Sequence, residues 1–346
     1  MRDYGVRFGK KLTPFSQKVM ELGVIGMKSS NIGGQAVLEG IMMKNGNRYA
    51  VAVRKPDGNI DVKTETCSDE KYRTLKKIPF VRGIFQFIDS MVLGMKTLTY
   101  SASFWEEEEE IKKPMTAKEA KKQEKKESLF MACTIAVSVV LAVAIFMVLP
   151  YVISDLFDGV IRSRFQKTVI EGLIRIAIFI VYVLLISKMK DIKRVFMYHG
   201  AEHKCINCIE RGAKLNVENV RDSSKEHKRC GTSFLFFVLF VSIIVCFFIT
   251  AESRVLRILL RIALLPVIAG ISYEFIRLAG RSDNPVVNLL SKPGLALQRL
   301  TTKEPEDDMI EVAIQAVEAV FDWKSYLREN FGVQTEEAGD TEDESA

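Results

Sequence analysis

All three histidines of the chain lie between residues 199 and 227, and their types and spacing could do chemistry. His199 and His203 are four residues apart, so on a helix they face the same way and could hold one metal ion. Glu202 directly precedes the second histidine, close enough to orient a water molecule beside the metal and to accept its proton. This H-x-x-E-H order is the inverted counterpart of a zinc protease signature. The motif therefore predicts a divalent metal site with Glu202 as its catalytic residue.

Two further pairs of potential ligands follow, each with two residues between its members: Cys205 and Cys208, then His227 and Cys230. In one interpretation, the two histidines of the first motif bind a catalytic metal ion, and His227, Cys230 or a carboxylate completes the ligand set. In the other, the two later pairs enclose a structural zinc ion of the Cys3His type. A catalytic site keeps one coordination position open for water and a structural site does not, so the sequence leaves both interpretations open. Imidazole and thiolate together favour zinc, with iron and manganese as alternatives.

The chain that must position these residues has the composition of an integral membrane protein. Of its 346 residues, 48% are hydrophobic and 27% are charged, and the apolar residues gather in blocks. A helix that spans a bilayer needs about 20 mostly apolar residues. Four blocks meet this requirement: 129–153, 168–187, 233–250 and 255–279. We therefore expect four transmembrane helices.

The segment 78–101 is a different kind of apolar stretch. It carries Arg82, Asp89 and Lys96 at a spacing of about seven residues, which places the charges along one stripe of a helix. This pattern favours an amphipathic helix that lies on the membrane interface or dips into it. A fifth span is the alternative.

Positive charge predicts how the spans are oriented, because cytoplasmic segments carry an excess of Lys and Arg. Seven lysines and two glutamates lie between residues 112 and 126, and eleven Lys or Arg lie in 188–232. The short connections 154–167 and 251–254 hold three and one. Four spans in the cell membrane, with both termini in the cytoplasm, place every segment on its preferred side.

Charged residues inside apolar blocks are costly and need partners. Glu274 lies near the inner end of the last block, on the same side as the histidines, so it could be a further metal ligand or could orient one. The alternative is an ion pair with Arg277. Glu171 lies near the outer end of the second block, and we expect an ion pair with Arg175 or Arg261.

A small antiparallel sheet is expected before the first span. Three runs have the character of strands: 37–43, 49–54 and 60–65. The segments 44–47 and 56–59, which separate them, are strong turn signals. So small a sheet needs a partner surface, and the later loop 188–232 could supply it.

The expected organisation follows from these elements. It comprises a basic segment 1–30, a β element 31–77, an amphipathic interfacial helix 78–104, a charged linker 105–127, two spans in 128–187, a cytoplasmic loop with the metal site 188–232, two spans in 233–280, a C-terminal helical region 281–331 and an acidic disordered tail 332–346. Within the C-terminal region, 308–321 has helical periodicity. The fold class is a mainly α-helical membrane protein with a small cytoplasmic β element.

Three motifs in this order resemble one family: GGQAVLEGIMM at 33–43, YHGAEHK at 198–204 and HKRCGTSF at 227–234. Over about 28–321, the chain is similar to the YqhQ-like bacterial membrane proteins. That family is a domain of unknown function whose label of metal-dependent enzyme is itself inferred from motifs. The resemblance therefore implies a site but says little about a reaction.

The residues that the resemblance implies for the site are His199, Glu202, His203, His227 and Cys230. Cys205 and Cys208 are not part of the family signature, which lowers the weight of the structural zinc site. Gln35 and Glu39 belong to the pattern, so the small sheet is expected to fold over the metal loop, and Glu39 is a further candidate to bind the metal or to orient a ligand.

Two functions are the main candidates for a protein with these motifs and apolar blocks. The first is a metal-dependent hydrolase at the cytoplasmic membrane interface, acting on a peptide or lipid-derived substrate that arrives from the plane of the membrane. The second is a membrane scaffold or assembly factor with a structural metal clip. A transporter is less favoured, because four spans with few charges at mid-depth leave little to line a pathway. The bilayer itself is an expected partner, and no nucleic acid is expected.

Overall fold

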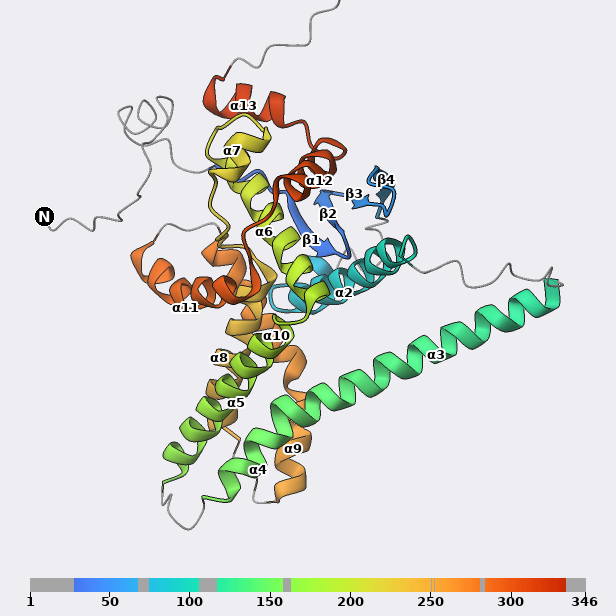
Figure 1. Cartoon of the computed structure of the whole chain (residues 1–346). Coiled ribbons are helices and arrows are strands. Elements are labelled where there is room, and N and C mark those ends of the chain that lie inside the picture. The colour runs from blue at the N-terminus through green and yellow to red at the C-terminus, as the bar shows by residue number, and fades with distance from the viewer. Residues whose placement is uncertain are drawn as a thin grey trace, which may run out of the picture.

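The computed structural model describes residues 28–67, 75–105, 117–157, 163–249, 251, 253–280 and 284–333. Most of the expected segments 1–30 and 332–346 lies outside these residues, as does the first half of 105–127. The second half of that linker begins helix α3 (Ala117–Val143). In Figure 1 the described chain forms a head, with the sheet and several helices, above a stem of long helices.

A four-stranded antiparallel sheet lies in the head, with its strands paired in chain order. The strands are β1 (Gly33–Val37), β2 (Gly40–Asn45), β3 (Arg48–Arg54) and β4 (Ile60–Thr66). The two expected turns are confirmed, since Gly46 and Gly58 adopt the positive φ angles, 57° and 86°, that glycine tolerates best. The register pairs Met43 with Ala50 across the first of these turns.

The expected first strand, 37–43, is wrong, because the chain reverses direction at Leu38 and Glu39 and forms two strands there. Glu39 has a φ of 49°, which is uncommon for a residue other than glycine. Its carboxylate accepts hydrogen bonds from the Arg194 guanidinium and, at 3.3 Å, from the Tyr198 hydroxyl. These contacts hold the strained turn in place, and they come from residues more than 150 positions away.

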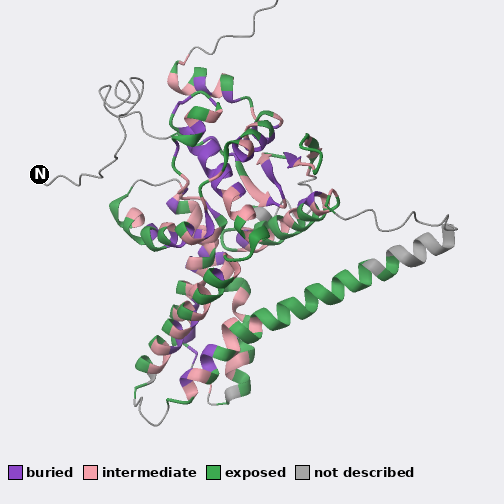
Figure 2. Ribbon diagram, viewed as in Figure 1, coloured by how far each residue is buried: buried purple, intermediate pink, exposed green. Residues whose placement is uncertain are grey.

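Both faces of the sheet are covered. Helices α6 (Lys190–Glu210) and α12 (Asp307–Glu318) pack against one face, and α2 (Val81–Ala102) covers the other. The first face carries Ile41, Met43, Ala50 and Ala52, and the second carries Val37, Met42, Val51 and Val53. This alternation along each strand is the period of two that a sheet between two apolar layers requires. Figure 2 shows the buried residues concentrated where α6 meets the sheet.

The expected connection 188–232 between the second and third apolar blocks is largely helical. Helix α6 takes up its first half, and the short helix α7 (Val217–Arg221) lies in the second. The first turn of α6 carries Asp191, where the helix dipole favours an acidic group. From Tyr198 to Glu210 nearly every side chain of α6 is buried, so this helix is the central element of the head.

The C-terminal region supplies three more helices: α11 (Pro285–Thr301), α12 and α13 (Trp323–Phe331). The helical periodicity over 308–321 is thereby confirmed, and its apolar residues join the core of the head. Between α11 and α12, the chain crosses α6 as an extended strap (302–306). Lys303 donates its backbone N–H to the Phe196 carbonyl at 2.9 Å, and its own carbonyl lies against Gly200.

The stem contains two described helices that are long and apolar enough to cross a membrane. They are Ser128–Asp155, formed by α3, the π-helical turn η2 (Ala144–Val148) and α4 (Leu149–Asp155), and Phe165–Ile186 within α5 (Arg164–Ile186). A third span results if α9 (Arg254–Ala263) and α10 (Leu265–Ala279), bent by 41°, count as one. Helix α8 (Gly231–Phe247) is apolar but shorter. The described helices thus supply two or three of the four expected spans and associate the protein with a membrane.

A buried ion cluster joins the helices of the stem. Glu171 on α5 binds Arg175 on the same helix at 2.8 Å and Arg261 on α9 at 2.6 Å and 2.7 Å. Arg175 also donates to the Ser242 hydroxyl of α8 at 2.7 Å. The expected pairing of Glu171 is therefore confirmed with both candidates at once.

Candidate metal centre

His199 and His203 on α6 meet Cys230 at the start of α8. One ring nitrogen of each histidine and the Cys230 sulfur lie within 4.8 Å of one another, and His199 Nε2 is 3.2 Å from Cys230 Sγ. The two rings are 4.4 Å apart between centroids. Their spacing of four residues on α6 places them on one face, as the sequence predicts. We call these three residues the His/His/Cys cluster.

Backbone carbonyls fix the orientation of both rings. His199 Nδ1 is 2.9 Å from the Thr301 carbonyl oxygen, and His203 Nδ1 is 2.7 Å from that of Lys225. A carbonyl oxygen can only accept a hydrogen bond, so each Nδ1 must carry the proton and donate. In the neutral rings, the lone pair then lies on Nε2. Metal-binding histidines in proteins are held in this way.

Cys230 occupies the N-cap position of α8. Its sulfur accepts a hydrogen bond from the Thr232 backbone N–H at 3.4 Å and contacts the Thr232 hydroxyl at 3.1 Å. The first N–H groups of a helix lack partners within the helix and favour an anionic atom beside them. The third member of the cluster is therefore a sulfur held at a helix N-terminus beside the Thr232 backbone N–H.

Glu202 lies beside the cluster and is only 5% exposed. Burial raises the pKa of its carboxyl group, against the opposing effects of His199 and of the Gly34 backbone N–H. Gly34 belongs to β1, and a Cβ atom there would lie 3.1 Å from Glu202 Cγ and 2.5 Å from the Met42 carbonyl oxygen. The close approach of strand and helix thus requires glycine at this position.

His227 lies next to the cluster but is not part of it. Its ring centroid is 5.7 Å from that of His203, and its Nε2 is 3.6 Å from a carboxylate oxygen of Glu210. Burial lowers the pKa of His227. Burial alone would raise the pKa of Glu210, but the hydrogen bond from His227 and the charge of Arg229 hold it below its usual value. His227 is thereby tied to an acidic partner that the sequence analysis missed.

Gln298 of α11 is a second residue that the sequence did not single out. It is completely buried, accepts the His227 backbone N–H at 2.9 Å and donates to the His227 carbonyl at 2.7 Å. It also donates to the Ser233 hydroxyl of α8 at 2.7 Å. This one side chain fixes the segment that leads from His227 into Cys230. The only signal in the sequence is a polar residue on the apolar side of a helix.

The structure does not bring Cys205 and Cys208 to the cluster. Both are buried in the core of the head, and the Cys208 thiol donates to the Lys214 carbonyl at 3.4 Å. Burial raises the pKa of both thiols, which favours the neutral form. The geometry therefore does not support the Cys3His interpretation, in which these two cysteines would join His227 and Cys230.

The two remaining candidate ligands have other partners. Glu274 binds the Arg82 guanidinium of α2 and accepts the Phe80 backbone N–H at 3.1 Å, so its ion pair is formed with Arg82 and not with Arg277. Glu39 is bound to Arg194 at the turn between β1 and β2. Among the residues that the structure describes, neither carboxylate joins the cluster.

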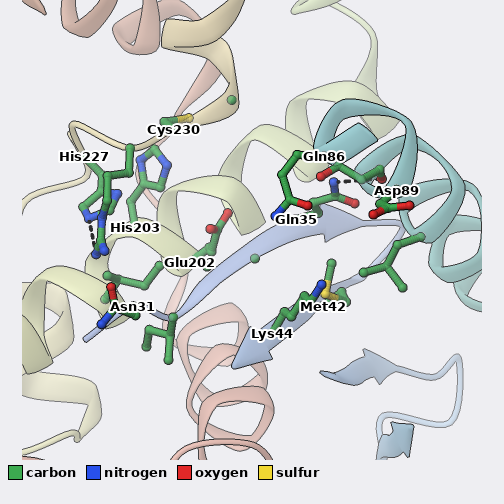
Figure 3. A pocket seen from close by; sticks show the side chains of 18 of the residues that line it. Asn31, Gln35, Met42, Lys44, Gln86, Asp89, Glu202, His203, His227 and Cys230 are labelled. Carbon is green, nitrogen blue, oxygen red and sulfur yellow. Dashed lines mark hydrogen bonds between the residues drawn. The ribbon is translucent and has the colours of Figure 1, made fainter. Parts of the chain in front are cut away.

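A cavity of about 710 Å³ opens beside the cluster. Strands β1 and β2, helices α2, α6 and α10, and the start of α8 line it. Figure 3 shows Glu202, His203, His227 and Cys230 at one end of this space and Gln35, Gln86 and Asp89 at the other. Gln35 links β1 to α2 by donating to the Ser90 carbonyl at 3.3 Å. The sheet thus does fold over the metal motif, as the resemblance implies.

Replacing Gly200 by Ala should weaken the head measurably. A Cβ atom at this position would lie 2.0 Å from the Lys303 carbonyl oxygen, so the strap must move away from α6. Such overpacking costs about 1–3 kcal/mol of unfolding free energy. It would also pull Thr301 away from His199. We expect a lower thermal midpoint in detergent for Gly200→Ala.

Gly33→Ala is the matched control for this experiment, because nothing lies within 4 Å of a Cβ atom built on Gly33. Its thermal midpoint should stay close to that of the wild type. Equal midpoints for the two variants would contradict the close packing of the strap on α6.

Comparisons with known proteins agree with this layout. Residues 78–323 match the family described as "Protein of unknown function (DUF1385)". The "Uncharacterized protein YqhQ" of Bacillus subtilis (strain 168) is 38% identical over 291 residues, which cover 82% of this chain and 90% of the relative. No solved structure shows significant similarity to the chain. The matched region contains the whole His/His/Cys cluster together with the helices of the stem, and the chain belongs to the DUF1385 family.

Proposed function

We propose that the protein is a metal-dependent hydrolase whose active site is the His/His/Cys cluster and the adjoining cavity. One observation carries this proposal. His199 directs its Nε2 atom at the Cys230 sulfur, one ring nitrogen of His203 lies within 4.8 Å of both, and backbone carbonyls contact both Nδ1 atoms. Without a metal ion, the His199 ring and the Cys230 thiol contact each other directly. With one, the cluster is a ligand set of two nitrogens and one sulfur, which suits zinc.

Glu202 supplies the second part of the proposed chemistry. A bound divalent ion acts as a Lewis acid and makes water more acidic. The oxygen of a water molecule bonds to the electrophilic carbon or phosphorus of the substrate, and Glu202 accepts the proton. The bond to the leaving group then breaks, and the same proton passes to that group. The buried position of Glu202 beside the cavity supports this role.

The number of ligands favours an enzyme over a structural clip. Structural zinc sites are closed by four protein ligands, whereas catalytic sites use three and leave one position for water or substrate. Three ligand atoms converge here, and the cluster lines a cavity. The scaffold hypothesis requires a closed site, so we place it second.

We also propose that the stem crosses the cytoplasmic membrane four times, with the head and both termini in the cytoplasm. The candidate spans Ser128–Asp155 and Phe165–Ile186, the bent pair α9–α10 and the shorter α8 would be the four crossings. The excess of Lys and Arg in 112–126 and 188–232 supports this orientation. In this arrangement, the active site lies at the cytoplasmic surface of the bilayer.

Metal content per chain tests the proposed centre directly. Detergent-purified wild-type protein should carry one divalent ion per chain, measured by plasma emission spectrometry. His203→Ala should lose it, because a site that keeps only one nitrogen and one sulfur ligand binds weakly. Cys230→Ser is a second ligand variant in case His203→Ala does not fold, and circular dichroism checks the helix content of both.

Cys208→Ser is the control, since Cys208 lies in the core of the head and outside the cluster. It should keep the ion. Loss of metal from Cys208→Ser, with retention in Cys230→Ser, would instead restore a site built on the CxxC pair. A metal-free, folded wild type after purification with added zinc would refute the proposed function.

A further inference from the structure

The cavity is lined by cationic side chains that the proposed hydrolysis does not use. The cationic side chains that line it are Lys44, Arg82, Arg229 and Arg277, and the carboxylates are Asp89 and Glu202. Arg82 and Arg229 are held by Glu274 and Glu210. Within the described part of the chain, neither Lys44 nor Arg277 forms an ion pair with an acidic side chain. Among the described residues, two positive charges therefore line the cavity outside any ion pair, and Arg277 also interacts electrostatically with Glu274, the ion-pair partner of Arg82.

These side chains are positioned for an anion of some size. Arg82 uses Nε and Nη2 for Glu274, which fixes the plane of its guanidinium group at the cavity wall. Arg277 follows Tyr273 by one helical turn on α10, and both line the same cavity. Arginine in a fixed orientation suits the oxygens of a phosphate group. A volume of about 710 Å³ is far more than inorganic phosphate needs and fits a larger ligand.

The position of the cavity indicates where such a ligand comes from. One wall belongs to α10, which is part of a candidate membrane span. Another belongs to α2, which turns Asp89, Ser90 and Leu93 toward the cavity. The opposite side of α2 exposes large apolar residues: Phe87, Ile88, Met91, Val92 and Met95. The charged cavity is thus bordered by surfaces that suit hydrocarbon.

We propose that the cavity binds the phosphate-bearing headgroup of an anionic membrane lipid, while the acyl chains remain against α10 and the apolar side of α2. Basic pockets beside transmembrane helices on the cytoplasmic side recognise lipid headgroups in this way. That such a lipid is also the substrate rests on the proposed function, because the metal cluster lies in the same cavity. The binding of the headgroup itself does not require the metal.

Binding of dihexanoyl phosphatidylglycerol to metal-depleted, detergent-purified protein tests the proposal. Isothermal titration calorimetry should give a saturable isotherm for this lipid with the wild type. Dihexanoyl glycerol, which has the chains without the phosphate, and glycerol 3-phosphate, which has the phosphate without the chains, should each bind at least tenfold more weakly. The Lys44→Gln/Arg277→Gln double variant should raise the Kd for the lipid at least tenfold.

Lys324→Gln is the matched control, because this exposed lysine on α13 lies outside the cavity and should leave the Kd unchanged. Equal binding of dihexanoyl glycerol, or an unchanged Kd in the double variant with its helix content intact, would overturn the headgroup site. Equal binding of glycerol 3-phosphate would show that the cavity binds a soluble phosphate ester, and it would overturn the proposal of a lipid ligand. Because the protein is metal-depleted, a failed metal assay leaves this result standing. If the metal site is proven but the lipid does not bind, the proposed lipid substrate is wrong and the proposed metal centre stands.

Discussion

Glu202→Gln should keep its metal ion and lose catalytic turnover by roughly 10²- to 10⁴-fold, the usual contribution of a general base. The amide has nearly the shape of the carboxylate and can still contact the Gly34 backbone, but it cannot accept a proton from water. The ligand atoms of His199, His203 and Cys230 are unchanged. The measurement pairs metal content with hydrolysis of a chromogenic nitrophenyl ester, used as a generic probe of water activation.

Glu226→Gln is a suitable control for this experiment. Glu226 forms an ion pair with Arg299 at 2.8 Å and does not line the cavity. It should hydrolyse the ester at the wild-type rate. If Glu202→Gln is as active as the control, Glu202 is not the base, and another group near the cluster must activate the water.

Glu171→Gln should destabilise the stem by about 3–5 kcal/mol, the cost of removing one partner from a buried ion pair. Glu171 is 3% exposed and is the shared partner of Arg175 and Arg261, which are equally buried. The Nε atoms of both arginines already lack hydrogen-bond partners among the described residues. Neutralising Glu171 leaves two guanidinium groups in an apolar bundle with no counter-charge among the described residues. A large drop of the thermal midpoint in detergent is the expected readout.

An exposed ion pair provides the comparison. Glu311 is 54% exposed in its side chain and pairs with Arg54 at 3.1 Å. Surface pairs of this kind contribute at most about 1 kcal/mol, so Glu311→Gln should leave the midpoint almost unchanged. Similar midpoints for the two variants would show that Glu171 does not hold the helices of the stem together.

The parts of the fold that local patterns encode could be predicted from the sequence. The Asn45-Gly46 and Asp57-Gly58 signals mark real turns, and the periodicity over 308–321 marks a real helix. The turn at Glu39 could not be predicted, because its strain is compensated by Arg194, which is distant in the chain. Within 188–232, the histidine spacing predicts a helix, but the many charges of the segment gave no sign that α6 is buried at the centre of the head.

The candidate site also has parts that the sequence predicts and parts that it does not. The spacing of His199 and His203 predicts their shared face, and Cys230 was among the expected ligands. The sequence could not decide whether the two histidines of the first motif or the CxxC pair share a site with Cys230, since only the packing of α6 shows that Cys205 and Cys208 point into the core. Backbone carbonyls of Thr301 and Lys225 orient the two rings. Because every residue has a backbone carbonyl, the sequence gives no sign of this role.

The residues that form and orient the His/His/Cys cluster lie far apart in the sequence, so the cluster depends on the order in which the helices assemble. His199 is 31 residues from Cys230 and 102 residues from the Thr301 carbonyl, so the site is complete only when α8 and the end of α11 have docked on α6. Contacts of such sequence separation form late in folding. An ion that binds only the finished site adds its binding free energy to the stability of the native state. In the proposed function, metal supply would then limit how many chains mature, because a chain without the ion would lack the metal bridge between α6 of the head and α8 of the stem.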